Sequence, residues 1–226
     1  MISIIVPTYN ESKNIYKFFK NIKKIKFKYE LIFVDDRSTD NSTKIFQKIK
    51  NKKVKFIIRK SKKRDLSRSV ILGVKNAKYD NVMIMDCDLQ HSFNDTINLK
   101  KKFFKDNLDL VIGSRFLKKK YFGNIFLLRS ISSLLFILFI NLFFKKETTD
   151  PLSGFFICKK KIILNNKKNY FIKGYKILFD IIYNSNCEII KKDVQINFKK
   201  RIHGKSKLNI RIVLIFIRQI IYTKLR

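Results

Sequence analysis

The 226-residue sequence is poor in cysteine, which excludes two classes of small stabilised protein. Its three cysteines, Cys87, Cys158 and Cys187, lie far apart and in no metal-ligand spacing. A disulfide framework and a structural zinc site are therefore excluded, and we expect reduced, partly buried thiols in a cytosolic setting. The 46% apolar content excludes global disorder, and a chain of this length can bury a core in one domain.

The sequence also lacks an apolar run long enough to span a bilayer comfortably. The most apolar stretch, Ser130 to Phe144, is uncharged but is closed by Arg129 and Lys145, whereas a spanning helix needs about 20 such residues. We expect a helix that lies in the membrane interface or is buried in the core. The first strand-like run begins at Ser3, so we also expect no signal peptide.

Acidic residues are scarce, because 17 Asp and Glu stand against 51 Lys and Arg, for a formal charge of +34. Such a field attracts polyanions, which include nucleic acid, anionic lipid and phosphorylated substrates. The chain is rich in Lys, Asn, Ile and Phe together, as AT-rich genes encode, and this bias explains the lysines equally well. Net charge alone therefore does not identify a partner.

Apolar runs of strand length alternate with helix-like segments through the first half of the chain. Continuous rather than alternating runs are typical of strands covered on both faces, and they occur at Ile2–Val6, Leu31–Val34, Val54–Ile58, Val82–Met85 and Leu110–Ile112. Ile15 to Ile22 and Leu66 to Val74 follow helical spacing, and Asp40 is predicted to cap the helix carrying Ile45 and Ile49. The pattern predicts an α/β fold with a doubly wound, mostly parallel sheet and helices on both faces. Ligands bind such sheets at the carboxyl ends of the strands.

The second half is less regular. It contains a strand-like run at Phe155 to Cys158, a helical segment at Tyr175 to Tyr183 and one or two strands over Ile189 to Phe198. Leu208 to Leu225 predicts a basic amphipathic helix, typical of a membrane surface or a partner groove. We see no internal repeat or linker. The predicted organisation is one domain over residues 1–207, with an interface helix at about 125–144, followed by the helix over 208–226.

The acidic residues concentrate where chemistry is expected. Asp86-Cys87-Asp88-Leu89-Gln90 directly follows a predicted strand, and hard oxygen ligands at this spacing suit Mg²⁺ or Mn²⁺ that also hold a diphosphate. An isolated Asp-x-Asp is more often a solvated loop. Here, however, Asp35-Asp36 and Glu11 follow two other strands, so five of the 17 acidic residues fall in three loops. This clustering favours a metal and nucleotide site.

Six motifs in order along the chain resemble the family 2 glycosyltransferases. The first three are Ile5 to Glu11, Asp35 to Asp40 and Asp86 to His91; the others are Gly113-Ser114-Arg115, Asp150 to Phe156 and Arg201 to Leu208. Together they resemble the dolichol-phosphate mannose synthases and their bacterial polyprenyl-phosphate glycosyltransferase relatives. The resemblance covers nearly the whole chain and implies a GT-A fold, which agrees with the strand–helix alternation.

The resemblance implies a role for each motif residue. The nucleotide sugar would be held by Pro7, Tyr9, Glu11, Asp36, Asp86, Arg201 and Lys205. The metal would be bound by Asp86, Asp88 and the amide oxygen of Gln90. The acceptor phosphate would be met by Arg115, Arg129 and Ser133. The catalytic set would be Asp88, Arg115, Arg129, Asp150 and Arg201.

Simpler alternatives exist for some of these residues. The alternative for Arg129 is a flanking charge at the end of an apolar helix. For Arg201 and Lys205 it is a solvated basic loop, which the Gly-Lys-Ser-Lys context disfavours. Asp150 either orients the acceptor or caps the next element. His91 and His203 are predicted to be loop neighbours rather than catalysts.

Three positions depart from the family pattern. Arg37 replaces the usual glycine after the acidic pair, which predicts that this loop approaches the nucleotide differently. Asp65-Leu66-Ser67 replaces a loop that often reads Gly-Leu-Gly, which predicts different base contacts there. Ser92 replaces a common proline, a minor change at a helix start.

The resemblance implies transfer of a hexose, with mannose from GDP-mannose favoured over UDP-glucose, to a dolichyl or undecaprenyl phosphate with inversion. Another sugar or a non-lipid acceptor is the alternative within the class. A nucleic-acid-binding protein would explain the charge but not the acidic loops, which repel phosphates unless metal-filled, so no nucleic acid is expected. We expect peripheral association with the cytoplasmic face of a membrane, either alone or with a separate membrane subunit.

Overall fold

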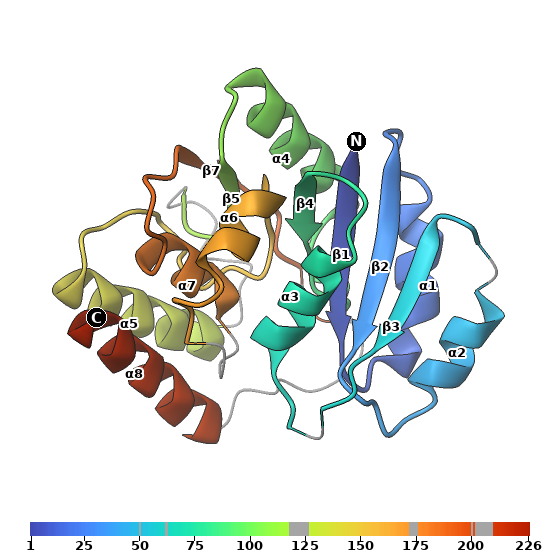
Figure 1. Ribbon diagram of the computed structural model, residues 1–226, viewed down its shortest axis with the longest axis horizontal. Helices are drawn as coiled ribbons and strands as arrows, with labels where there is room; N and C mark the ends of the chain where they lie inside the picture. The colour runs from blue at the N-terminus through green and yellow to red at the C-terminus, as the bar shows by residue number, and fades with distance from the viewer. Residues whose placement is uncertain (50, 62, 118–126, 172–175, 200, 202–209) are drawn as a thin grey trace.

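A mixed seven-stranded sheet organises the protein in a computed structural model, which describes residues 1–226 except 50, 62, 118–126, 172–175, 200 and 202–209 (Figure 1). The strands are β1 (Ile2–Thr8), β2 (Tyr29–Asp35), β3 (Val54–Ile58), β4 (Asn81–Ile84), β5 (Leu110–Ser114), β6 (Phe156–Lys159) and β7 (Lys191–Gln195). Their order across the sheet is β3-β2-β1-β4-β6-β5-β7. The five apolar runs of the first half therefore all form strands, and two more come from the second half.

One strand runs against the others. β1 pairs in parallel with β2 and β4, β2 with β3, and β5 with β7, whereas β6 is antiparallel to both of its neighbours, β4 and β5. Because β6 is the only reversed strand among those described, β4 and β5 still point the same way. The loops that follow β1, β2, β4 and β5 therefore open at one edge of the sheet.

Helices cover both faces of the sheet, as the continuous apolar strands predict. On one face α1 (Ser12–Ile22), α2 (Ser42–Lys48) and α4 (Phe93–Lys105) bury Phe18, Phe46 and Phe103 against the strands. On the other face α3 (Leu66–Lys75), α6 (Lys160–Asn166) and α7 (Ile177–Tyr183) bury Val70 and Ile163. The predicted α/β architecture with a mostly parallel sheet between two helical layers is confirmed.

Two further helices, α5 (Leu127–Phe143) and α8 (Ile210–Leu225), lie side by side beyond α7 (Figure 1). Ile140, Phe179 and Phe216 form a third apolar cluster that joins α5, α7 and α8. The rings of Phe136 and Phe216 meet edge to face at 5.5 Å between centroids. In the described part of the chain, no helix is both long enough and apolar enough to cross a membrane.

Three local predictions, for Ser92, for Asp40 and for the cysteines, can be compared with the structure. Ser92 is the N-cap of α4 and accepts a hydrogen bond from the backbone N–H of Asn94, so serine replaces proline at a helix start as expected. The predicted cap at Asp40 is wrong, since α2 begins at Ser42 and Asn41 is its N-cap residue. The Asp40 carboxylate accepts hydrogen bonds from the backbone of both Ser12 and Ser42, and so joins α1 to α2 instead. None of the three cysteines, all of which the structure describes, forms a disulfide; Cys87 and Cys158 are buried and Cys187 is exposed.

Candidate active site

The loops after β1 and β2 form one hydrogen-bonded unit. The backbone N–H of Asn10 donates to Ser38 Oγ at 2.8 Å, and the Asn10 side-chain oxygen accepts from the Thr39 N–H at 2.8 Å. Thr8 and Asp35, the last residues of the two strands, lie opposite each other in the parallel register. The first two motifs of the sequence therefore sit together at the carboxyl edge of the sheet.

Arg37 has the backbone conformation that explains why glycine is usual at its position. Its φ is +58°, in the left-handed region where a side chain is disfavoured. Asp35 stabilises the turn, because its carboxylate accepts the Ser38 N–H at 2.8 Å and the Ser38 hydroxyl at 2.6 Å. These hydrogen bonds therefore hold the turn with arginine at its left-handed position.

Asp36, a predicted nucleoside ligand, is buried and already engaged on both carboxylate oxygens. Oδ1 accepts from Arg59 Nε at 2.7 Å, and Oδ2 accepts from the backbone N–H of Asp65 at 2.7 Å. Arg59 is itself buried and also donates to the carbonyl of Lys63. Sequence reasoning missed Arg59, although its place directly after β3, at the same edge of the sheet, could have indicated it.

The remaining predicted nucleoside residues, Pro7, Tyr9 and Glu11, lie at and just after the end of β1. Pro7 is half-buried at the end of β1, and the guanidinium of Arg64 covers the half-buried ring of Tyr9 at 4.5 Å. Glu11 accepts a hydrogen bond from the side chain of Asn14 at 2.7 Å.

Asp65 stands where the family often has glycine, and it caps α3. Its carboxylate accepts the Arg68 N–H at 3.1 Å. Burial raises the pKa of Asp65 to about 6, although the hydrogen bond and charge of Arg68 and the charge of Arg59 oppose the shift. This replacement therefore serves the helix as well as the loop.

The loop after β4 gathers the three predicted metal ligands. It turns at Leu89, whose φ is +63°, and the backbone N–H of Gln90 donates to Asp88 Oδ1 at 3.2 Å. One nitrogen of Arg201 lies 2.7 Å from Asp88 Oδ2 and 3.4 Å from the Gln90 amide oxygen. Arg201, 113 positions away in the sequence, thus places a positive charge between two of the predicted ligands.

Asp86 lies between a histidine and a glycine. The distance from His91 Nε2 to Asp86 Oδ2 is 3.7 Å, and a β-carbon added to Gly154 would lie 2.5 Å from Asp86 Oδ2. The His91 ring is buried against Phe155 and Phe198. Only glycine allows the backbone to approach the carboxylate this closely.

The two carboxylates of this loop have opposite pKa shifts. Desolvation raises the pKa of Asp86, but His91, Lys176 and Arg201 outweigh it, and the net shift is downward. Desolvation and the neighbouring charge of Asp86 raise the pKa of Asp88. Two carboxylates that repel each other favour a cation between them.

The oxygen donors present fit a hard divalent cation. Asp86, Asp88 and Gln90 offer two carboxylates and one amide oxygen, the donor type that Mg²⁺ and Mn²⁺ prefer. Among the residues that the structure describes, no group of three or more His, Cys, Asp and Glu side chains has metal-binding geometry. A bound ion would therefore depend on the amide and on oxygens from its substrate.

Arg115 and Asp150 form a second centre at the same edge. Arg115 Nε donates to Asp150 Oδ2 at 2.7 Å, and one terminal nitrogen donates to Oδ1 at 2.8 Å. Asp150 is fully buried, and Phe116 and Phe198 flank the guanidinium at 5.0 and 5.5 Å. Desolvation lowers the pKa of Arg115, but the charges of Asp150 and Asp86 raise it overall. Asp150 therefore holds Arg115 and does not cap the next element.

Three predicted residues have side chains outside the described part of the structure: Arg129, Lys205 and His203. The backbone of Arg129 lies in the first turn of α5, and Ser133 is half-buried one turn further on. Lys176 was not predicted, yet its ammonium group donates to the carbonyl of Leu152 at 3.1 Å and helps lower the pKa of Asp86. Its position immediately before α7 was the available signal.

Comparison with solved structures supports the fold. The structure of S. aureus TarS residues 1–349 in complex with UDP-GlcNAc superposes with a TM-score of 0.67 at 19% identity, covering 98% of this chain and 66% of that one. Glucosyl-3-phosphoglycerate synthase from Mycobacterium tuberculosis in complex with UDP also gives 0.67, at 15% identity over 100% and 79% of the two chains.

Comparison of sequences identifies the family. A dolichol-phosphate mannosyltransferase from Pyrococcus furiosus is 32% identical over 97% of this chain and 62% of its own length. One from Saccharomyces cerevisiae is 29% identical over 96% of this chain and 85% of its own. This chain therefore spans less than two thirds of the Pyrococcus relative. The family described as Glycosyl transferase family 2 matches residues 3–167, and the chain belongs to it.

Proposed function

We propose that the protein transfers a hexose, with mannose as the favoured sugar, from a nucleotide diphosphate sugar to a polyprenyl phosphate. The observation that carries the proposal is the arrangement at the sheet edge, where an acidic loop of metal-ligand type lies close to two arginines. The names of the Pyrococcus and Saccharomyces relatives support the choice of sugar and lipid. GDP-mannose is the favoured donor and UDP-glucose the alternative.

The donor half of the site is assigned to the loops after β1, β2 and β4. Asp86, Asp88 and Gln90 would hold Mg²⁺ or Mn²⁺, which supplies charge neutralisation to the leaving diphosphate. Arg201 already contacts Asp88 and Gln90, so a diphosphate at this loop would lie within its reach. Arginine suits this task because its planar fork can hold two phosphate oxygens at once.

The acceptor half is assigned to Arg115, with Arg129 and Ser133 of α5 beside it. A phosphate monoester is largely dianionic at pH 7, since its second pKa is about 6, and it needs no general base. Its oxygen attacks the anomeric carbon as the bond to the diphosphate breaks, and attack from the opposite face inverts that centre. Arg115, buried and held by Asp150, would meet the attacking phosphate with a fixed positive charge.

The outer helices support a membrane-bound acceptor. On α8, Phe216 and Ile220 are buried in the apolar cluster shared with α5 and α7, whereas Leu214, Ile221 and Leu225 are 52%, 51% and 83% exposed. A helix that leaves apolar residues exposed beside basic ones, here Arg218 and Lys224, is suited to contact lipid. We propose peripheral association with the cytoplasmic face through α5 and α8, with or without a separate membrane subunit.

The decisive experiment measures transfer of radiolabelled sugar to a short polyprenyl phosphate, with GDP-mannose and UDP-glucose compared and with Mg²⁺ or Mn²⁺ added or chelated. We expect divalent-dependent transfer, faster with GDP-mannose. Transfer only to a water-soluble acceptor would contradict the lipid assignment, and equal rates in chelator would contradict the metal. In Asp88→Asn we expect loss of most activity and weaker Mn²⁺ binding by calorimetry, with an unchanged far-UV spectrum.

A further inference from the structure

The segment that connects α5 to β6 is fixed to the sheet by one carboxylate that no motif contains. Asp193, in the middle of β7, accepts the hydroxyl of Thr148 at Oδ1, at 2.7 Å. Its Oδ2 accepts both the backbone N–H and the hydroxyl of Thr149, at 2.7 and 2.6 Å. Three charge-assisted hydrogen bonds to one carboxylate therefore join this segment to β7.

The directions of these hydrogen bonds link the position of Asp193 to that of Asp150. An ionised carboxylate can only accept, so both threonine hydroxyls must donate to Asp193 and keep their lone pairs for other donors. The backbone N–H of Asp150 donates to Thr148 Oγ1 at 3.2 Å. Thr149 Oγ1 lies 2.7 Å from Ser114 Oγ, which must then be the donor. Each hydroxyl thus has one fixed orientation.

The far end of this network is Arg115. Asp150 holds its guanidinium through two side-chain hydrogen bonds and accepts its backbone N–H at 3.2 Å. Ser114 Oγ accepts the backbone N–H of Phe116 at 3.0 Å, on the other side of the arginine. Asp193 is therefore linked through hydrogen bonds to Ser114 and Phe116, on the two sides of Arg115. It is also linked to Asp150, the carboxylate that binds the Arg115 guanidinium.

We infer that Asp193 is a positioning residue, which fixes the guanidinium of Arg115 toward the acceptor phosphate through Thr148, Thr149 and Asp150. The inference rests on the proposed function for its effect on transfer, but its structural part does not. The hydrogen bonds of the Asp193 side chain in the described part of the chain go to Thr148 and Thr149, outside the predicted site residues. The contribution of Asp193 is to restrict the conformational freedom of Arg115, one of the two arginines assigned to the acceptor phosphate.

A neighbouring ion pair provides the matched control. Lys191 lies two residues before Asp193 on β7, and its ammonium is 2.6 Å from Glu147, one residue before the two threonines. This pair joins the same strand to the same connector but has no hydrogen bond to Asp150. Glu147→Gln therefore loosens the connector without breaking the network, whereas Asp193→Ala breaks it.

The first test needs no substrate. Hydrogen exchange of the Arg115 Nε–H, followed by NMR in the full-length protein, should be slow in the wild type because Asp150 holds it. We expect at least about 10-fold faster exchange in Asp193→Ala, corresponding to loss of a charge-assisted network, and little change in Glu147→Gln. Equal exchange in Asp193→Ala and wild type, with the fold intact by melting temperature, would overturn the inference.

The second test uses transfer kinetics and includes Asp193→Asn in case the alanine variant misfolds. Asparagine has one acceptor fewer and cannot satisfy all three donors. We expect the KM for polyprenyl phosphate to rise about 10-fold with donor affinity unchanged, and the same substitution to add nothing in an Arg115→Gln background. An equal effect in both backgrounds would show that Asp193 does not act through Arg115. Wild-type protein without transfer activity would instead contradict the proposed function and leave the exchange result standing.

Discussion

At the scale of single residues, the geometry of the site depends on side chains and backbone that approach one another closely at the carboxyl edge of the sheet. Gly154 lies so near Asp86 that a methyl group would meet its carboxylate at 2.5 Å. Arg59 and Asp65 occupy both oxygens of Asp36, and Arg201 contacts both Asp88 and Gln90. The carboxylates of Asp36 and Asp88 are therefore oriented by neighbours that lie far away in the sequence.

We predict that Gly154→Ala abolishes most metal-dependent activity at a small cost in stability, because the added methyl displaces Asp86, which is partly exposed and can move. Gly73→Ala is the control: its methyl would meet Ile5 in the core at 2.5 Å, far from any predicted ligand. The control should lower the melting temperature more, with activity per folded molecule retained. Normal Mn²⁺ affinity in Gly154→Ala would contradict the placement of Asp86 as a ligand.

The carboxyl of Asp65 predicts a pH-dependent stability. Burial raises its pKa to about 6 from the ordinary 3.8, so the folded state binds more protons than the unfolded state between these values. This carboxyl therefore favours folding below about pH 4, and the advantage is lost as the pH rises through 6. Asp65→Asn keeps a good N-cap residue and should raise the melting temperature at pH 7 relative to wild type, but not at pH 4. Equal gains at both pH values would contradict this assignment.

At the scale of elements, the sequence predicted the strands better than their arrangement. Apolar runs located β1 to β5 because strands covered on both faces must be apolar throughout. The same criterion carries no direction, so the reversal of β6 between β4 and β5 could not be predicted. The predicted cap at Asp40 is one residue too early, since Asn41 is the N-cap residue. The sequence pattern could not separate the two positions, because the Asp40 carboxylate still accepts the Ser42 N–H.

The candidate site was also predicted only in part from the sequence. Motifs adjacent to strand ends gave Asp86, Asp88 and Arg115, because parallel strands bring their loops to one edge. Arg59, Lys176 and Asp193 were missed because each acts through a contact with a distant part of the chain. Arg59 after β3 and Lys176 before α7 had only their position as a signal, and Asp193 had no local signal. The choice between two roles for Asp150 likewise required its contacts.

The exposed apolar residues of α8 predict where lipid binds. Leu214→Glu together with Ile221→Glu should weaken binding to anionic vesicles strongly, because each buried apolar side chain contributes about 1.5–3 kcal/mol. Ile97→Glu, a change at an equally apolar and 43% exposed position on α4, is the matched control and should bind normally. Flotation with vesicles measures both, and equal binding by all three proteins would exclude α8 as a contact.

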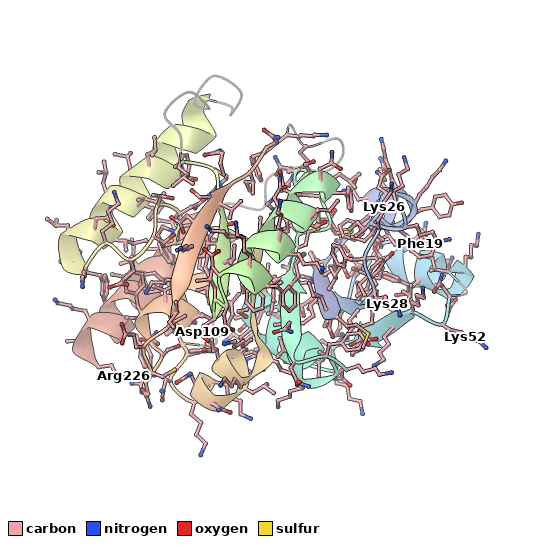
Figure 2. The ribbon with its side chains drawn as sticks, turned by 90° about the horizontal axis from the view of Figure 1, so that it is seen from above. Phe19, Lys26, Lys28, Lys52, Asp109 and Arg226 are labelled. Carbon is pink, nitrogen blue, oxygen red and sulfur yellow. The ribbon has the colours of Figure 1, made fainter. Side chains whose placement is uncertain are left out.

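At the scale of the whole molecule, positive charge is not confined to the helices proposed to meet lipid. Figure 2 shows Lys26, Lys28 and Lys52 at the end of the molecule opposite Arg226. Lysines that face anionic lipid contribute about 1 kcal/mol each and are screened by salt, whereas buried apolar side chains are not. The two contributions can therefore be separated.

We accordingly predict that high salt releases only part of the protein from membranes, and that carbonate or mild detergent releases the remainder. Sedimentation of washed membranes measures both fractions. Complete release by salt would show that charge alone holds the protein. A protease-protected fragment crossing the bilayer would contradict peripheral binding.

The place of β6 in the sheet has a consequence for the order in which the chain folds during synthesis. β1 to β4 can pair with one another as soon as they leave the ribosome, since β1 lies between β2 and β4. β5 cannot, because both of its neighbours, β6 and β7, are made after it. We expect the half that carries Asp86 to assemble early, while Arg115 waits on a strand without partners until residue 159 has emerged.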